Sequence, residues 1–170
     1  KDTTLVDFEL ARLDIWHYND DYLQPQQLKQ LNQELKRTYL AVIKPGANEM
    51  VQLGDENTEN ILLVNEGNAD WVLGISTKGN RIARQWEGRS KFTAYMININ
   101  TAERTAIKNN SYGNYVASPM GKYVYWYDPS LKHYFTYNVA NGNINNVTQK
   151  IKEPLYDTEN DVPDFPGAAG

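Results

Sequence analysis

The sequence contains no cysteine among its 170 residues. This absence excludes disulfide frameworks, thiolate nucleophiles and cysteine-based zinc sites. No apolar run approaches the length of a membrane-spanning helix, so we expect no membrane span. Basic residues are few and scattered, with 17 Lys and Arg against 21 Asp and Glu, which gives a net charge of −4. Without a basic face, the chain is not expected to bind nucleic acid.

An initiator methionine and a signal-like apolar stretch are also missing from the first residues, KDTTLVDFEL. The last residues, DFPGAAG, carry no strand or helix pattern. We therefore expect the chain to be an excised piece of a longer protein. Its length and its 41% hydrophobic content suffice for one domain with a sizeable core.

The sequence also lacks the motif of a serine hydrolase nucleophile, G-x-S-x-G. The nearest of its five serines is Ser90 in GRSKF, which has no second glycine. A catalytic triad needs a histidine base, and only His17 and His133 are present, neither accompanied by a plausible nucleophile. We predict no catalytic residue in the chain and interpret both histidines as structural.

One acidic stretch partly matches a calcium-binding loop. Oxygen-bearing side chains fall at its positions one, three, five and twelve, namely Asp55, Asn57, Glu59 and Glu66. The turn position holds Asn60 where glycine is required, and no flanking helices are expected. We favour a solvated loop entering the strand ILLV, and we interpret the acidic run at 157–164 as a linker. The sequence thus predicts no metal and no cofactor.

Apolar and polar residues alternate over most of the chain, which predicts β-strands. Aromatic residues make up 12% of the chain, and twelve of them are tyrosines, which strands favour. Gly, Asn and Pro clusters separate the strand candidates. These candidates are FELARLDIWHY, ENILLVNE, ADWVLGIS, FTAYMININ, NYVAS, GKYVYWYD and HYFTYNVA. Short, evenly spaced strands are typical of an all-β sandwich, barrel or propeller.

One segment departs from this pattern. Leu28, Leu31 and Leu35 follow the spacing of a helix face, and Pro25 is compatible with a first helical turn. We predict a short amphipathic helix near residues 25–37, inserted between strands.

A strand–turn–strand hairpin repeats three times, in YLAVIKPGANEMV, YMININTAERTAI and FTYNVANGNINNV. The repeats begin at Tyr39, Tyr95 and Phe135. Together with the strands before each hairpin, they predict about three four-stranded antiparallel blades of a partial β-propeller. The expected blades are residues 7–53, 58–109 and 112–150, with 151–170 as a linker or the start of the next blade. A sandwich would also alternate, but it does not explain a repeated hairpin.

The aromatic stretch SPMGKYVYWYD at 118–128 is consistent with either a ligand platform or a packed strand. Alternation places Val124 and Trp126 on one side and the three tyrosines on the other. Because stacked blades bury both faces, we favour packing, with Tyr123 and Trp126 as packing residues. Residues 118–121 form the predicted turn.

This stretch resembles a blade of bacterial TolB-like and peptidase propellers, except that Met120 replaces the usual Asp or Asn. Longer blocks resemble the N-terminal propeller of bacterial prolyl oligopeptidase family proteins, including dipeptidyl peptidase IV-like ones. The blocks are DIWHYNDDYLQPQQLKQLNQELKRTYLAV, RQWEGRS and KHYFTYNVANGNINNVTQKI with PLYDTENDVPDFPGAAG.

The resemblance implies a non-catalytic propeller segment that gates and selects short peptides for a C-terminal α/β-hydrolase domain. That domain would lie after Gly170, in a periplasmic or secreted bacterial serine peptidase. Three blades are fewer than the family's ring and would leave blade faces and sheet edges uncovered, so we expect self-association through open blade edges, or disorder, unless the parent protein is an unusual short form. The charged loop with Arg84, Trp86, Glu87 and Arg89 is the candidate for facing the substrate chamber. The alternative is a TolB-like propeller that binds a protein or glycan.

Overall fold

The computed structural model describes residues 6, 13–46, 49–159 and 166–169. The chain divides into two compact units, Lys1–Arg37 and Thr38–Gly170. Within the described ranges, no helix is long and apolar enough to cross a membrane.

The first unit contains the predicted helix, α1 (Gln24–Glu34). It begins with proline in its first turn, as expected, and ends three residues earlier than predicted. Glu34 forms an ion pair with Arg37 just beyond the helix. No residue of α1 is buried, so the helix keeps its leucine stripe in solvent.

The predicted strand FELARLDIWHY is wrong over its described part. Residues 13–17 form no strand, and Leu13 and Ile15 are exposed. Alternation alone cannot hold a strand that has no partner to complete its hydrogen bonds. The rest of that prediction, residues 8–12, lies outside the described residues.

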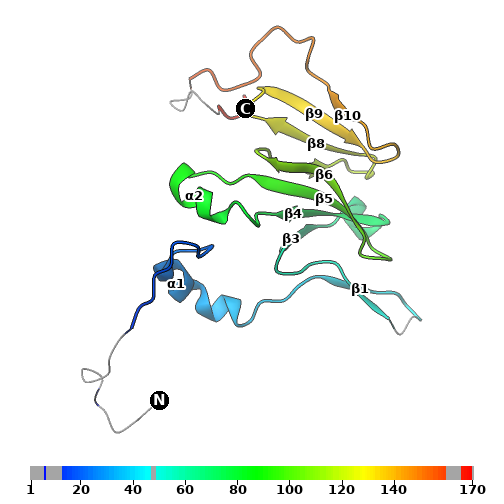
Figure 1. The fold of residues 1–170 in the computed structure, drawn as a ribbon. Coiled ribbons are helices and arrows are strands. Elements are labelled where there is room, and N and C mark those ends of the chain that lie inside the picture. The colour runs from blue at the N-terminus through cyan, green and yellow to red at the C-terminus, as the bar shows by residue number, and fades with distance from the viewer. Residues whose placement is uncertain (1–5, 7–12, 47–48, 160–165, 170) are drawn as a thin grey trace. The chain divides into compact units, whose positions relative to one another are not determined.

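The second unit is built from three antiparallel sheets (Figure 1). The first sheet pairs β1 (Ala41–Ile43) with β2 (Met50–Gln52). The middle sheet has the order β3-β4-β5-β6, and the last sheet has the order β10-β9-β8-β7. Both four-stranded sheets therefore follow chain order, and no described strands close into a barrel. Their bounds are β3 Asn60–Leu62, β4 Trp71–Ser76, β5 Phe92–Asn98, β6 Arg104–Ser111, β7 Val116–Ala117, β8 Tyr123–Asp128, β9 His133–Asn138 and β10 Ile144–Asn146.

All three predicted hairpins are confirmed, as β1–β2, β5–β6 and β9–β10. Their turns also share a backbone feature. The residue seven positions after each repeat start has a positive φ, at Gly46 (79°), Ala102 (58°) and Gly142 (71°). Glycine adopts this conformation without strain, whereas Ala102 must tolerate it. The repeat in the sequence is therefore also a repeat in geometry.

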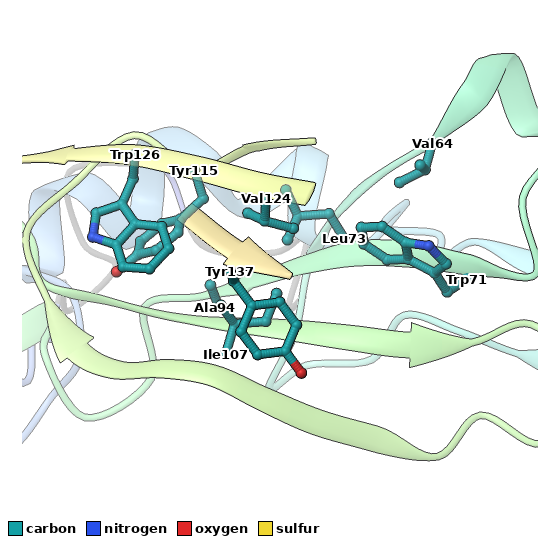
Figure 2. Packing of buried hydrophobic residues seen from close by; sticks show 9 residues of the cluster. All are labelled: Val64, Trp71, Leu73, Ala94, Ile107, Tyr115, Val124, Trp126 and Tyr137. Atoms are coloured by element: carbon teal, nitrogen blue, oxygen red, sulfur yellow. The ribbon is translucent and has the colours of Figure 1, made fainter. Parts of the chain in front are cut away.

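The middle sheet is buried on both faces. Trp71 and Leu73 of β4 pack with the last sheet in one cluster, while Val72 packs toward β1 and β2 in another. Figure 2 shows the larger cluster, in which Tyr115, Val124, Trp126 and Tyr137 of the last-sheet region meet residues of the middle sheet. Period-two alternation on β4 thus supplies an apolar side chain to each neighbour.

The turn predicted at 118–121 is present, closed by a hydrogen bond from the Gly121 amide to the Ser118 carbonyl of 2.8 Å. Gly121 has φ of 66°, and a Cβ there would lie 2.8 Å from Val64 Cγ1. Glycine at this position therefore permits both the backbone of the turn and its close contact with Val64, which follows β3. Met120, which stands where the motif usually has Asp or Asn, is exposed, so packing does not restrict the residue at this position.

The packing prediction for 123–127 is half confirmed. Val124 and Trp126 are fully buried, with the Trp126 ring 5.1 Å from the Tyr115 ring and 5.8 Å from the Phe135 ring. Tyr123 is 43% exposed, so naming it a packing residue was wrong. It lies on the outer face of the last sheet, which no described strand covers.

A helix replaces the charged loop expected around RQWEGRS. The segment α2 (Arg81–Glu87) ends at Gly88, whose φ of 68° is the left-handed conformation common just after a helix. The sequence pattern did not predict this helix, because the segments on either side of it alternate as strands do. Its sequence signal was the run of helix formers before Gly88.

We expect substitutions on both faces of β4 to destabilise the protein. Leu73→Ala, at a fully buried position, should lower the free energy of unfolding by roughly 2–5 kcal/mol. Val72→Ala, on the opposite face, should lower it by about 2 kcal/mol. The measurement is equilibrium denaturation, with Leu63→Ala, at a 61% exposed leucine, as the matched control expected to change little. The prediction would be contradicted if one of the two substitutions left the free energy of unfolding nearly unchanged, because the sheet would then be buried on one face only.

Candidate functional site

The four residues predicted to face a chamber lie on α2 and just after it. Trp86 is 84% exposed, and Arg84 and Glu87 are also exposed. Glu87 accepts a hydrogen bond from the Tyr112 hydroxyl at 3.0 Å. Arg89 lines a cavity that the other three do not reach. The structure thus connects Glu87 and Arg89 to one site through Tyr112 and leaves Trp86 as a separate surface feature.

The cavity has a volume of about 620 Å³ and lies at one end of the middle and last sheets. Its walls come from β3, β4 and the start of β5, from the connection between β6 and β7, and from the end of β8. Most of its lining is apolar or aromatic, with Phe92, Tyr112, Tyr115 and Tyr127 as its rings. This size and lining are typical of sites that hold a small organic ligand.

Tyr112 stands among charged groups at the cavity. Lys91 Nζ lies 5.4 Å from its ring centroid, a cation–π contact. Burial, followed by the hydrogen bond and the negative charge of Glu87, raises the pKa of Tyr112, although Arg89 opposes this. Tyr112 is therefore a neutral phenol at physiological pH.

Tyr115 is the most buried phenol of the site, at 3% exposure. Its hydroxyl shares a hydrogen bond with Ser111. Burial, with a contribution from the Asp128 charge, raises the pKa of Tyr115 to about 12, although the Ser111 hydrogen bond opposes the shift. Its ring lies tilted against that of Trp126, with the centroids 5.1 Å apart, so the residue joins the cavity wall to the core.

Two hydroxyl groups of the lining residues are buried and have no hydrogen-bond partner among the described residues. They are Ser90 Oγ and the Tyr127 hydroxyl. Burial raises the pKa of Tyr127, and the neighbouring Tyr134, Asp128 and Tyr156 add to the shift. Both groups are thus neutral and able to donate, and a buried donor left unsatisfied costs roughly 1–3 kcal/mol.

A C-terminal segment lies at the same cavity. Gly167 and Ala168 are among its lining residues, and Ala168 forms a β-bridge with Tyr156. The Asp157 amide donates to the Gly167 carbonyl, and the Ala169 amide donates to the Leu155 carbonyl, each at 3.0 Å. Part of the segment predicted as a linker is therefore ordered against the last-sheet region.

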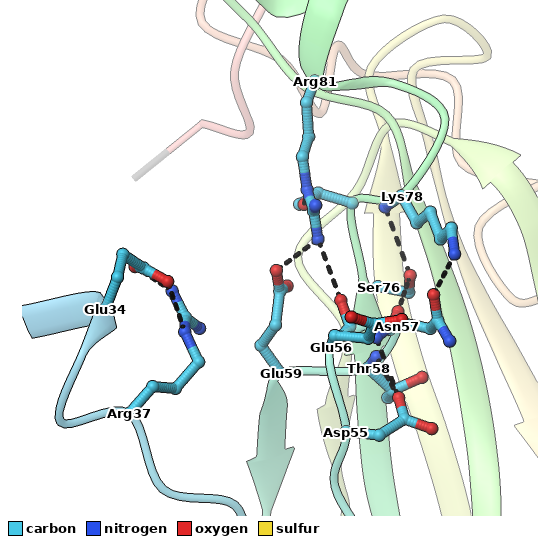
Figure 3. Close-up of polar contacts among 11 residues, drawn as sticks. Glu34, Arg37, Asp55, Glu56, Asn57, Thr58, Glu59, Ser76, Lys78 and Arg81 are labelled. Carbon is cyan, nitrogen blue, oxygen red and sulfur yellow. Dashed lines mark hydrogen bonds and ion pairs between the residues drawn. The ribbon is translucent and has the colours of Figure 1, made fainter. Parts of the chain in front are cut away.

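The loop considered for calcium uses its carboxylates within the protein (Figure 3). Asp55 Oδ1 accepts from the amides of Asn57 and Thr58 at 2.8 Å, and its Oδ2 lies 3.0 Å from Arg104. Burial by itself raises the pKa of Asp55, but the bonds from Arg104 and the two amides outweigh it and lower the pKa. Glu59 pairs with Arg81. No group of three or more metal-ligating side chains occurs in the described ranges.

The histidines have local partners. The Asn19 amide donates to His17 Nδ1 at 3.2 Å, and the His17 ring stacks on Tyr18. His133 Nδ1 lies 3.1 Å from Thr148 Oγ1, which also accepts from the Tyr134 amide. The His17 contacts stabilise the turn that follows it, and the His133 contacts stabilise the end of the β9–β10 hairpin. Among the hydrogen bonds of the described residues, neither histidine contacts a serine.

The sequence did not single out Tyr112, Tyr115, Tyr127 and Ser90 as one site. Ser90, the pair Tyr112 and Tyr115, and Tyr127 come from three parts of the chain, and the packing of two sheets brings these parts together. In comparisons with known proteins, no family model matches the chain, and no curated protein matches it.

The shifted pKa of Tyr115 predicts alkaline instability. Because its folded-state pKa lies above the ordinary value of 10, the folded protein holds this proton more tightly than the unfolded chain does. The resulting stability is present below pH 10 and is lost as the pH rises toward 12, by on the order of 2 kcal/mol.

Denaturant titrations between pH 8.5 and 12 would measure this loss. In Tyr115→Phe, the free energy of unfolding should fall less steeply as the pH rises. Tyr125→Phe, the same change at an exposed position of β8, should leave the pH dependence unchanged. An unchanged decline in Tyr115→Phe would contradict the prediction.

Proposed function

We propose that this chain is a non-catalytic β-propeller segment of a serine peptidase of the prolyl oligopeptidase family. In this proposal it gates and selects short peptides for a C-terminal α/β-hydrolase domain outside these 170 residues. The peptidase would be a periplasmic or secreted bacterial protein.

The observation that carries the proposal is the stacking of like sheets. Two consecutive sheets each contain four antiparallel strands in chain order, and the middle one is buried on both faces. The blades of a β-propeller are four-stranded sheets that stack on one another in this way. In these terms the middle and last sheets are two blades, and β1–β2 is the outer hairpin of another.

The outer faces of the stack support the same proposal. Ile43 and Met50 of the first sheet are exposed, as are Tyr123 and Tyr125 of the last sheet. Large apolar side chains on a sheet face favour coverage by another layer. In a propeller that layer is the next blade, and in an isolated piece it would be a second copy.

Gating would fall to the exposed end of α2. Trp86 presents almost its whole side chain to solvent between Arg84 and Glu87. Exposed tryptophans flanked by charges are common at surfaces that contact peptides and proteins. Neither histidine hydrogen-bonds a serine among the described residues, and the proposed role of this surface is to select peptides.

The second candidate is a propeller that only binds, without any hydrolase. The aromatic cavity favours it, because a ligand site lies wholly within the chain. The ligand would be a protein segment or a glycan.

The proposed function predicts a selective effect of Trp86→Ala in the complete gene product. We expect kcat/KM for an oligopeptide to change about tenfold, and kcat/KM for a dipeptide p-nitroanilide to stay within about twofold. Trp16→Ala, at another exposed tryptophan, is the matched control and should change neither.

The isolated 170-residue chain should hydrolyse neither substrate. Peptide hydrolysis by the isolated chain would contradict the proposal. A complete gene product without hydrolase activity, or without G-x-S-x-G after Gly170, would favour the binding module instead.

A further inference from the structure

We infer that the cavity between the middle and last sheets binds a small aromatic monocarboxylate, whose carboxylate pairs with the Arg89 guanidinium. This inference goes beyond the proposed function, because it assigns a small-molecule ligand to this segment whether or not a hydrolase domain follows it.

The first argument is the space in the cavity. With Gly167 and Ala168 on its lining, the cavity keeps a volume of about 620 Å³. This volume lies within the range of sites that hold small organic ligands and is far larger than a water molecule needs. A ligand can therefore enter without displacing any part of the described wall.

The second argument is the part of the wall that a ligand can reach. Ile75, Phe92 and Tyr112 are half-buried and Leu62 is 41% exposed, so each of these lining side chains keeps accessible surface. A flat aromatic ligand would bury its apolar faces against them. It would also form offset or edge-to-face contacts with the rings of Phe92 and Tyr112, which an aliphatic ligand cannot form.

The third argument is the charge of the lining. Arg89 is the one charged residue among the described lining residues, which include no Asp or Glu. Its positive charge acts at the Tyr112 hydroxyl, where it opposes the rise in the pKa of that group. An arginine on an otherwise uncharged lining favours a carboxylate, which it can bind through two parallel hydrogen bonds.

Two further charged groups contact Tyr112 beside the cavity. Glu87 accepts a hydrogen bond from its hydroxyl at 3.0 Å, and Lys91 Nζ lies 5.4 Å from its ring centroid. Glu87 is exposed, so solvent screens its charge, and the positive charge of Lys91 offsets it. The balance of charge therefore favours a ligand with one negative charge over a cation.

The test uses 2-naphthylacetate as the probe and its uncharged amide, 2-naphthylacetamide, as the matched ligand. Wild type should bind the carboxylate about tenfold more tightly than the amide, because the carboxylate brings a negative charge to its hydrogen bonds with Arg89. Isothermal titration calorimetry would measure both affinities. NMR chemical-shift changes should locate the probe at the backbone amides of 89–92 and 112–115.

The role of Arg89 is tested by removing its charge. Arg89→Gln should bind the carboxylate about tenfold more weakly than wild type does, and the amide within about twofold of wild type. The control is Lys122→Gln, which removes a positive charge from an exposed residue outside the lining. It should leave both affinities within about twofold.

The apolar part of the site is tested by filling the cavity. Leu62→Trp should weaken binding of 2-naphthylacetate by about tenfold or more, because the larger side chain takes the space of the ligand. Leu63→Trp, the same change at the next residue, which does not line this cavity, should leave the affinity within about twofold. Far-UV circular dichroism and denaturant titration would confirm that both variants fold. Decanoate, a carboxylate without a ring, should bind wild type more weakly than 2-naphthylacetate does.

The inference is overturned if folded wild type does not bind 2-naphthylacetate at millimolar concentration, or if the amide or decanoate binds equally well. It is also overturned if the shifted amides lie elsewhere, or if Arg89→Gln or Leu62→Trp binds the probe as wild type does. None of these measurements involves peptide hydrolysis, so their outcome is independent of the tests of the proposed function.

Discussion

The structure of residues 38–170 depends on burying both faces of the middle sheet. Strand β4 sends Trp71 and Leu73 to one side and Val72 to the other, and all three are buried. At Gly74 the packing leaves no space, since a Cβ would lie 2.6 Å from Ile97 Cδ1 and 2.9 Å from Thr58 Cγ2. Neither flanking sheet has a comparable strand, because each leaves one face uncovered by described strands. The first and last sheets are therefore stabilised chiefly through the middle one.

The cavity follows from the same stacking. Two sheets pack tightly along β4, β5 and β8, but at one strand end the chain must leave β6 and enter β7. That connection runs through Tyr112 to Tyr115, so it sets aromatic rings around the space where the sheets no longer touch.

Local patterns predicted local structure well. The hairpins at 39–51, 95–107 and 135–147 were predictable because their turns and strands are neighbours in sequence. The strand at 13–17 was not, because alternation does not reveal whether a partner strand exists. The α2 helix was missed because its signal, a short run of helix formers before Gly88, lies between segments with the alternation of strands. The cavity could not be predicted, since Ser90, Tyr115 and Tyr127 meet only through sheet packing, whose geometry no spacing in the sequence encodes.

The two proposed functions use different parts of this chain. Gating would use the exposed Trp86 on α2, and binding would use the aromatic cavity. Trp86 is exposed on a short helix, so the proposed gating by this residue would require another domain to face it. The cavity requires none, since all of its lining residues belong to the second unit. Tyr112 connects the two, because its hydroxyl donates to Glu87 on α2 while the residue lines the cavity.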